Sequence, residues 1–173
     1  MKKNVMWMLT VILFCGLTAT VLSSCGKDSD SSSTGGGSTG LEPAVGMNVS
    51  YEIQIGETTT DGFSVKVEYT DADGKSKTEI ISSKFSKSIT IKGVPCSATM
   101  TITATPKEGL TGDKYDLEFA YKMTGVGVTS KGKEMGYVKP LAEVVASTGI
   151  DKDKMKEVVR TATINCTSSG VTK

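Results

Sequence analysis

Hydrophobic and polar residues alternate along most of the chain beyond residue 47, a period of two that is typical of half-buried β-strands. The alternation is strictest at 115–123, where apolar residues occupy every second position: Tyr115, Leu117, Phe119, Tyr121 and Met123. Shorter runs of the same kind predict strands at 49–55, 63–69, 77–81, 89–91, 98–105 and 158–166. The chain is therefore expected to fold mainly as β-structure.

Turn-forming residues interrupt these strands. The segment Asp71–Gly74 combines aspartate with glycine, as a tight hairpin turn requires. Residues 124–136 are rich in glycine and lysine and predict an exposed loop or a weak hairpin, with flexibility at Gly125-Val126-Gly127. Residues 140–146 are compatible with a short helix that begins at proline, and Asp151 with the cap of another brief helical turn.

Short strands with antiparallel hairpin signals, and no long helical period, favour an all-β fold. The fold class we expect is an antiparallel β-sandwich of the immunoglobulin-like type, with one or two short helices near the C-terminus. A small β-barrel is the alternative. The domain is expected to span residues 47–173, a size that suits a single hydrophobic core.

The N-terminal segment has the composition of an export signal. Lys2 and Lys3 supply positive charge, and the run 5–21 is apolar apart from a few small or hydroxyl residues. Residues 1–24 are therefore predicted to be a signal peptide. An uncleaved signal anchor is the alternative, because an apolar run of this length could nearly cross a bilayer.

The run Leu22-Ser23-Ser24-Cys25 resembles the bacterial lipobox, in which a branched apolar residue and two small residues precede a cysteine. The resemblance implies that Cys25 is acylated and that cleavage before it makes it the first residue of the mature protein. Two or more acyl chains give stable anchoring, so the lipid bilayer is the expected partner of Cys25.

Residues 25–46 join this cysteine to the domain. Beyond Cys25 the segment is dominated by glycine, serine and aspartate, and such a composition cannot bury enough apolar surface to order itself. We expect a flexible linker with a reach of roughly 25 Å.

The charge balance gives no sign of a nucleic-acid partner. The chain has 20 lysine and arginine residues against 19 aspartate and glutamate residues. Loss of Lys2 and Lys3 with the signal would leave the mature chain close to neutral. A mixed, near-neutral surface argues against nucleic-acid binding.

Two cysteines remain for the domain, because Cys15 lies in the predicted signal and Cys25 in the lipobox. Cys96 and Cys166 both extend inward-facing strand positions, and an exported pair is a candidate disulfide. Two unpaired buried thiols are the alternative.

The sequence offers little catalytic chemistry. It contains no histidine, which excludes Ser-His and Cys-His pairs and removes the commonest zinc ligand. Asp71-Ala72-Asp73-Gly74 has the start of a calcium loop, but Ser82 stands where the bidentate glutamate is required. Asp116 and Glu118, like the other strand carboxylates, occupy polar-facing positions and are expected to be solvated. We expect no enzyme activity, no cofactor and no metal.

Aromatic residues give few candidates for binding. Four tyrosines of the domain share the inward parity of their strands. Phe85 and Tyr137 are the aromatic residues left without a clear inward position, and they either anchor a partner or cover the end of the sandwich.

The chain resembles small cell-envelope lipoproteins of Bacteroidetes that carry one immunoglobulin-like domain behind a lipobox and a polar linker. Some of these are similar to the MmpS group of transport-accessory proteins. The resemblance is carried by the segments 22–25, 67–75, 85–90 and 98–106. In place of the Leu-Pro-Trp of the MmpS motif this chain has Ser83-Lys84-Phe85.

The resemblance implies a protein of the outer membrane, on its periplasmic face or at the cell surface. The function that we expect is a noncatalytic binding or accessory module for an envelope protein or glycan. The alternative is a structural subunit of the fimbrial adhesin type, which assembles by strand exchange.

Overall fold

The alternating segments form strands in the computed structural model, which describes residues 42–137 and 140–173. In β2 (Phe63–Thr70), every second side chain is buried and the ones between are partly or fully exposed. The other strands are β1 (Ala44–Ile55), β3 (Ser76–Ile81), β4 (Lys84–Lys92), β5 (Cys96–Pro106), β6 (Lys114–Thr129), β7 (Glu134–Tyr137), β8 (Leu141–Asp151), β9 (Val158–Thr167) and β10 (Gly170–Thr172). A four-residue helix, α2 (Thr59–Gly62), precedes β2 and was not predicted.

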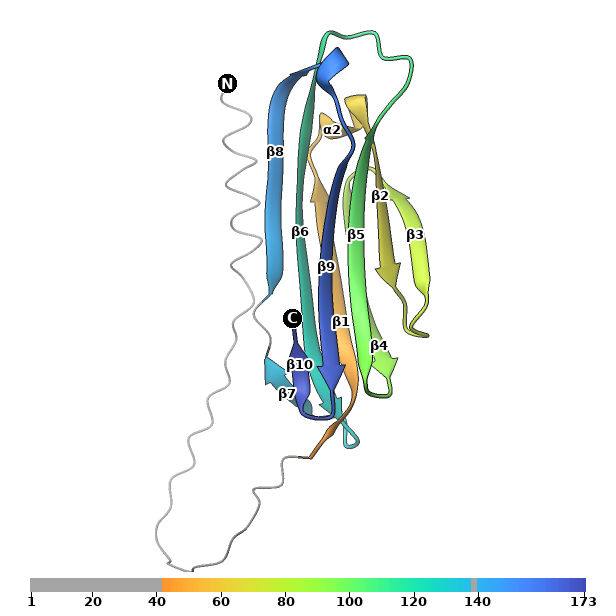
Figure 1. Cartoon of the computed structure of the whole chain (residues 1–173), viewed down its shortest axis with the longest axis vertical. Helices are drawn as coiled ribbons and strands as arrows, with labels where there is room; N and C mark the ends of the chain where they lie inside the picture. The colour runs from red at the N-terminus through yellow and green to blue at the C-terminus, as the bar shows by residue number, and fades with distance from the viewer. Residues whose placement is uncertain (1–41, 138–139) are drawn as a thin grey trace, which may run out of the picture. The chain divides into compact units, whose positions relative to one another are not determined.

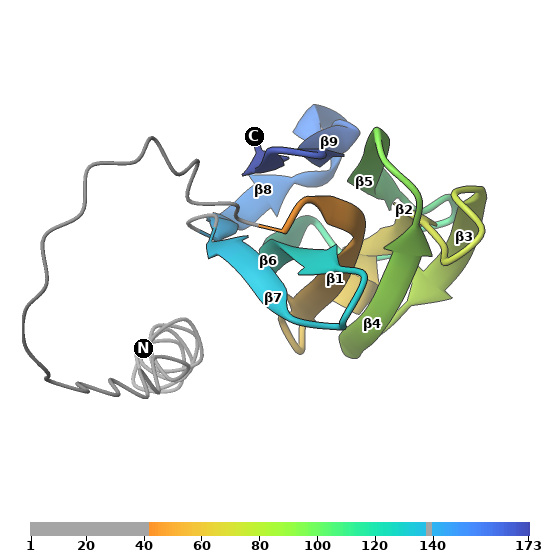
Figure 2. The ribbon, with the colours of Figure 1, turned by 90° about the horizontal axis from the view of Figure 1, so that it is seen from below.

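The strands form two antiparallel sheets that pack against each other (Figures 1 and 2). Sheet A has the order β4-β1-β6, and both β7 and β8 pair with the remaining edge of β6. Sheet B has the order β10-β9-β5-β2-β3. The predicted antiparallel β-sandwich is confirmed, and the alternative of a closed barrel is not.

Inward-facing side chains of both sheets fill the space between them. The largest fully buried ones are Tyr51, Tyr69, Phe63, Phe119 and Met47. The hydroxyl of Tyr51 donates a hydrogen bond of 2.9 Å to the backbone carbonyl of Thr70, so the buried phenol keeps a polar partner. The prediction that the tyrosines of β1 and β2 face the core is confirmed.

β4 is longer than the short strand predicted at Ile89 and Ile91. Its first half includes Phe85, which is 7% exposed and packs against the ring of Tyr69 with the ring centroids 5.2 Å apart. Of the two interpretations of Phe85, the structure therefore supports burial in the sandwich and not an exposed anchor. The side chain of Tyr137 lies outside the described residues.

Gly125 and Gly127 belong to a strand, so the prediction of a flexible loop there is wrong. β6 continues through both glycines to Thr129 and then forms a hairpin with β7, which confirms the weaker alternative of a hairpin. A Cβ atom on Gly125 would lie 2.8 Å from Cγ2 of Ile164 and 3.2 Å from Sδ of Met47. Glycine is required because the opposite sheet packs directly on the backbone.

The prediction of a short helix at 140–146 is also wrong, because β8 begins at Leu141. Leu141 pairs with Met123, and Val145 with Phe119, so the segment extends sheet A along β6. Leucine, alanine and glutamate favour helices, yet pairing with an existing strand edge outweighs that weak preference. The turn expected after Asp151 is present as one turn of 3-10 helix, Lys152–Lys154, without a hydrogen bond from the Asp151 side chain.

The ends of the domain differ slightly from the prediction. β1 begins at Ala44, before the expected boundary at Met47, and β10 follows the strand that was expected to be the last. The predicted signal peptide, the lipobox with Cys25 and most of the predicted linker lie outside the described residues.

Candidate functional site

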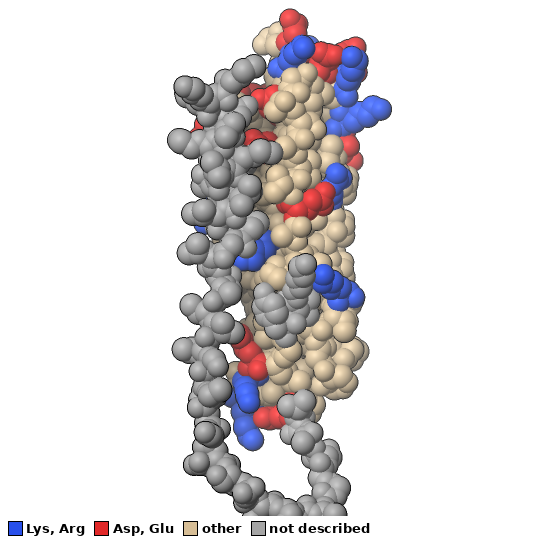
Figure 3. All heavy atoms as spheres, turned by 90° about the vertical axis from the view of Figure 1, so that its left-hand side faces the viewer, with Lys and Arg blue, Asp and Glu red and all other residues tan. Residues whose placement is uncertain are grey.

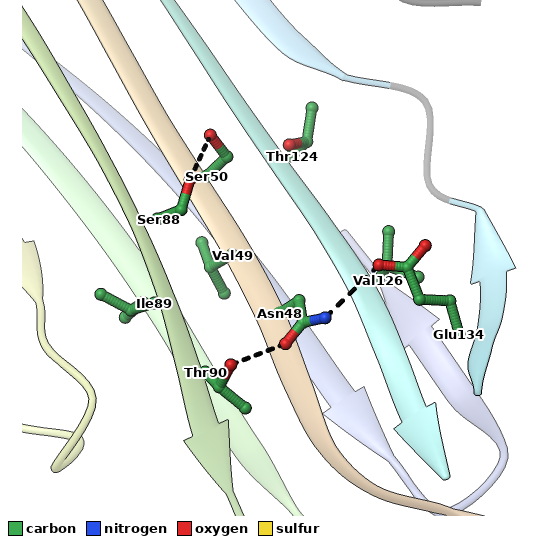
Figure 4. Close-up of a pocket in the computed structure, with 9 residues that line it drawn as sticks. All are labelled: Asn48, Val49, Ser50, Ser88, Ile89, Thr90, Thr124, Val126 and Glu134. Atoms are coloured by element: carbon green, nitrogen blue, oxygen red, sulfur yellow. Dashed lines mark hydrogen bonds between the residues drawn. The ribbon is translucent and has the colours of Figure 1, made fainter. Parts of the chain in front are cut away.

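An open polar groove crosses the outer face of sheet A, over β4, β1 and β6, and reaches β7 (Figure 4). Alternate residues of a strand face the same side, so neighbouring strands bring their outward polar groups together. The groove has a volume of about 480 Å³, which is within the range of small-ligand sites. Its polar lining consists of Asn48, Ser50, Ser88, Thr90, Thr124 and Glu134.

Asn48 is the centre of the hydrogen bonding in this groove. Its Oδ1 atom accepts a bond of 2.8 Å from the hydroxyl of Thr90 on β4, and its Nδ2 atom donates one of 3.4 Å to Glu134. One step along β1, the hydroxyl of Ser88 donates to that of Ser50 at 3.3 Å. β1 therefore carries a row of donors and acceptors whose positions are fixed by neighbouring strands.

The groove can hydrogen-bond a polar ligand, but its described lining offers little acid–base chemistry. Glu134 is the charged residue among the described lining side chains, and a hydroxyl there has no imidazole to activate it because the chain contains no histidine. The arrangement suits recognition of a polar surface, such as a hydroxylated or amide-rich ligand.

The carboxylates of β6 are less solvated than the sequence predicted. Burial raises the pKa of Glu118, and the neighbouring charge of Asp116 adds to the effect. Asp116 accepts hydrogen bonds from the hydroxyl of Thr58 at 3.3 Å and from the backbone N–H of Gly149 at 2.8 Å. Asp116 thus ties β6 to the segment before α2 and to β8, which is a structural role.

The turn at Asp71–Gly74 is a hairpin turn between β2 and β3, as predicted. Oδ1 of Asp71 accepts hydrogen bonds from the backbone N–H groups of Asp73 and Lys75, and Lys77 lies 3.2 Å from Oδ2. The bond from Lys75 is the main reason that the pKa of Asp71 is lowered. The carboxylate is used within its own turn. Over the described part of the chain, no cluster of three potential metal ligands occurs.

Each open side of the sandwich is bridged by a tyrosine, a carboxylate and a cation. We call these the β3/β4 bridge and the β8/β9 bridge, after the strands that they connect (Figure 2). In the β3/β4 bridge, Tyr69 donates to Glu79 at 2.6 Å, and Lys87 lies 2.8 Å from the Tyr69 oxygen and 3.6 Å from Glu79. This bridge connects sheet A with sheet B.

The β8/β9 bridge is formed by Tyr121, Glu143 and Arg160. The Tyr121 hydroxyl donates to Oε2 of Glu143 at 3.0 Å, and Nε of Arg160 donates to Oε1 at 2.9 Å. The bond from Arg160 lowers the pKa of Glu143. Burial, followed by the bond to Glu143, raises the pKa of Tyr121 to about 12. The bridge is therefore most stable with a charged glutamate and a neutral phenol.

Cys96 and Cys166 are opposite each other on β5 and β9, within sheet B. Both are present as thiols, and Cys166 is buried. Burial raises the pKa of both, that of Cys166 to about 11, so neither is an activated nucleophile. Directly opposed residues of antiparallel strands have Cα separations of about 4.5–5.5 Å, which falls within the range of disulfides. The candidate bridge remains a prediction.

Two features of these surfaces were not predicted from the sequence. The outward positions of β1 and β4 are occupied by Asn48, Ser50, Ser88 and Thr90, a polar row that appears once the two strands are paired. Arg160 shares the inward parity of its apolar strand neighbours, which signals a charge that needs a partner inside the sandwich.

No protein-family model matches the sequence, and no curated protein sequence matches it. Within the described residues, no helix has the length and apolar character needed to span a membrane. Leu22, Ser23, Ser24 and Cys25 are not among those residues.

We predict that the β8/β9 bridge makes the free energy of unfolding fall as the solution becomes acidic. The lowered pKa of Glu143 stabilises the fold fully above its ordinary value of 4.5, and this contribution is lost as the pH falls below that value. Glu143→Gln should cost up to about 1 kcal/mol at neutral pH, since the pair is partly exposed. With Glu143→Gln the free energy of unfolding should also fall less between neutral and acid pH. Urea unfolding at a series of pH values measures this difference. Glu108→Gln, in the exposed loop after β5, is the matched control and should leave the profile unchanged. Equal profiles for wild type and Glu143→Gln would contradict the prediction.

We also predict that Cys96 and Cys166 are bridged in the exported protein. Denatured, unreduced protein purified from the envelope should then show no thiol from this pair, and reduction should release two. A closed loop of this length would contribute roughly 4 kcal/mol on the chain-entropy model. Replacing both cysteines with serine should lower the free energy of unfolding by a similar amount. Two reactive thiols before reduction would rule out the disulfide.

Proposed function

We propose that this protein is a lipid-anchored, noncatalytic module of the bacterial cell envelope. The observation that carries the proposal is the lipobox-like run Leu22-Ser23-Ser24-Cys25 directly after the apolar segment 5–21. Acylation of Cys25 would hold the protein at the outer membrane, on its periplasmic face or at the cell surface. Two or three acyl chains would make the anchoring stable.

The start of the domain supports this arrangement. β1 begins at Ala44, and the sequence between Cys25 and that strand is dominated by glycine, serine, threonine and aspartate. A coil of about twenty such residues has a reach of roughly 25 Å. The sandwich would thus be separated from the lipid headgroups and accessible to a partner.

A noncatalytic role is supported by the use of the charged residues. Four carboxylates already have partners within the fold. Asp71 binds backbone N–H groups of its own turn, and Asp116 connects β6 with β8. Glu79 and Glu143 belong to the two bridges between the sheets. Together with a sequence that lacks histidine, this favours binding over acid–base or nucleophilic catalysis.

The polar groove of sheet A is the surface that we assign to the partner, an envelope protein or glycan. It offers fixed hydroxyl and amide groups on two adjacent strands, with Asn48 making two hydrogen bonds at its centre. Polar groups placed in this way orient a ligand, because each must be satisfied when water leaves.

The proposal extends to an immunoglobulin-like relationship for the sandwich. Its support is the packing of two antiparallel sheets in a domain of this size. The cysteines add nothing to it, because the hallmark disulfide of immunoglobulin domains joins the two sheets, whereas Cys96 and Cys166 are opposite each other within sheet B.

A structural subunit of the fimbrial adhesin type is the second candidate. The observation that favours it is the long outer edge of β8, which among the described residues has no strand beside it. Sheet edges of this kind accept further strands.

Lipidation can be tested on the protein extracted from membranes. We expect the N-terminal peptide to begin at Cys25 and to carry the mass of two or three acyl chains in a mass spectrum. Cys25→Ala removes the sulfur that would carry the lipid, and it should lower the amount of acylated protein in the membrane fraction. Cys15→Ala, within the predicted signal, is the matched control and should leave anchoring intact. An intact peptide from Met1 to Ser24 on the membrane-bound protein would overturn the proposal.

The groove can be tested by cross-linking capture from the native envelope, followed by identification of the captured protein or glycan. Asn48→Leu removes the two hydrogen bonds at the groove centre and should reduce capture severalfold. Gln54→Leu replaces another outward-facing amide of β1, outside the groove, and should leave capture unchanged. Equal capture by wild type and Asn48→Leu would show that the partner binds elsewhere.

A further inference from the structure

The edge strands of the sandwich differ in how they are protected from pairing with another chain. The outer edges of β3 and β4 belong to strands of six and nine residues, and both carry lysine: Lys77 on β3, and Lys84, Lys87 and Lys92 on β4. Lysines on an edge strand disfavour the approach of another strand. In sheet B, β10 covers one end of β9.

β8 lacks this protection. It has eleven residues, its sequence contains no lysine, and the structure shows pairing with β6 along one edge as its sole strand contact in the described chain. Alternate residues of such a strand direct their backbone N–H and C=O groups away from the sheet. From Leu141 to Gly149 the one charged residue is Glu143, and its charge is paired with Arg160 of β9 at 2.9 Å.

Over residues 142–146 the outward face of β8 is uncharged and consists of alanine and valine. Ala142, Val144 and Ala146 occupy successive outward positions, opposite Lys122, Ala120 and Glu118 of β6. Val144 is 44% exposed, which makes it one of few large apolar side chains so exposed in the described chain. Figure 3 views the molecule from the side on which β8 lies in Figure 1, where charged groups are spread along the length of the face with uncharged surface between them.

We propose that β8 pairs antiparallel with β8 of a second copy of this chain, joining two copies of sheet A into one continuous sheet. The pairing would use the unpaired backbone groups of β8 for affinity and the outward row of small side chains for fit. The proposal does not rest on the lipid anchor, since every residue that it uses belongs to the described domain.

The sequence of β8 is self-complementary, which favours a second copy of this chain as the partner of its outer edge. A two-fold axis at Val144 places Ala142 opposite Ala146 and Glu143 opposite Val145. An axis at Val145 places Val144 opposite Ala146 and Glu143 opposite Ser147. In both registers the outward alanine and valine side chains meet one another, and no like charges are directly opposed.

Cysteine trapping in native membranes tests the pairing in either register. The full-length double variant Val144→Cys with Ala146→Cys should form a disulfide-linked dimer under mild oxidation. Position 144 meets itself when the axis is at Val144, and positions 144 and 146 meet each other when the axis is at Val145. The matched control is Thr78→Cys with Ile80→Cys, two outward positions at the same spacing on the β3 edge, where Ile80 is 79% exposed. The control and the wild-type chain should give little dimer.

A second measurement uses a charge in place of the apolar residue. Val144→Lys should weaken the association of detergent-purified protein at least tenfold in sedimentation, whereas Ile80→Lys should leave it unchanged, with thermal unfolding confirming that both variants fold. Equal trapping at the two edges, or a wild-type protein that remains monomeric at all concentrations, would overturn the proposal. Both assays can be repeated with Cys25→Ala, so their failure is distinguishable from a failure of lipidation.

Discussion

The closure of the two open sides of the sandwich is the constraint on which the rest of the structure depends. Two stacked sheets bury their facing surfaces, but side chains between the edge strands are reached by water from the side. Here the same solution occurs on both sides: a tyrosine from an inner strand donates to a carboxylate on an edge strand, and a cation comes from the opposite sheet. The tyrosine ring belongs to the core, and its hydroxyl provides the polar end.

The two bridges are similar in arrangement and differ in chemistry. Lys87 offers a point charge to Tyr69 and Glu79, whereas Arg160 donates to one oxygen of Glu143 while Tyr121 occupies the other. All four charged side chains are about 40–46% exposed, so their net contribution to stability is small. Their structural role is to give the hydroxyls of the buried Tyr69 and Tyr121 polar partners at the open sides, so that both rings can stay in the core.

Much of the fold could be predicted from the sequence because a period of two is a direct consequence of strand geometry. Tyr115 to Met123 could hardly form anything other than a strand. The failures have one cause, which is that local composition does not reveal tertiary partners. Gly125 is a loop residue by composition but is required where Ile164 packs against the backbone, and Leu141 starts a strand because the edge of β6 is available to it.

The candidate site was harder to predict for a related reason. Asn48 and Thr90 are ordinary surface residues until the register of β1 and β4 brings them together. A single strand cannot show which polar groups will be neighbours, since that depends on pairing between segments far apart in sequence. Arg160 was an informative exception, because a charge among inward-facing residues of one strand demands a partner from another.

The position of β1 has a mechanical consequence. It is the first strand of the domain, and it is hydrogen-bonded along both edges, to β4 and to β6. Tension applied through the N-terminal side of the chain and directed along β1 would therefore load two ladders of hydrogen bonds at once and in shear. Such a force would be shared between β1 and both of its neighbours in sheet A.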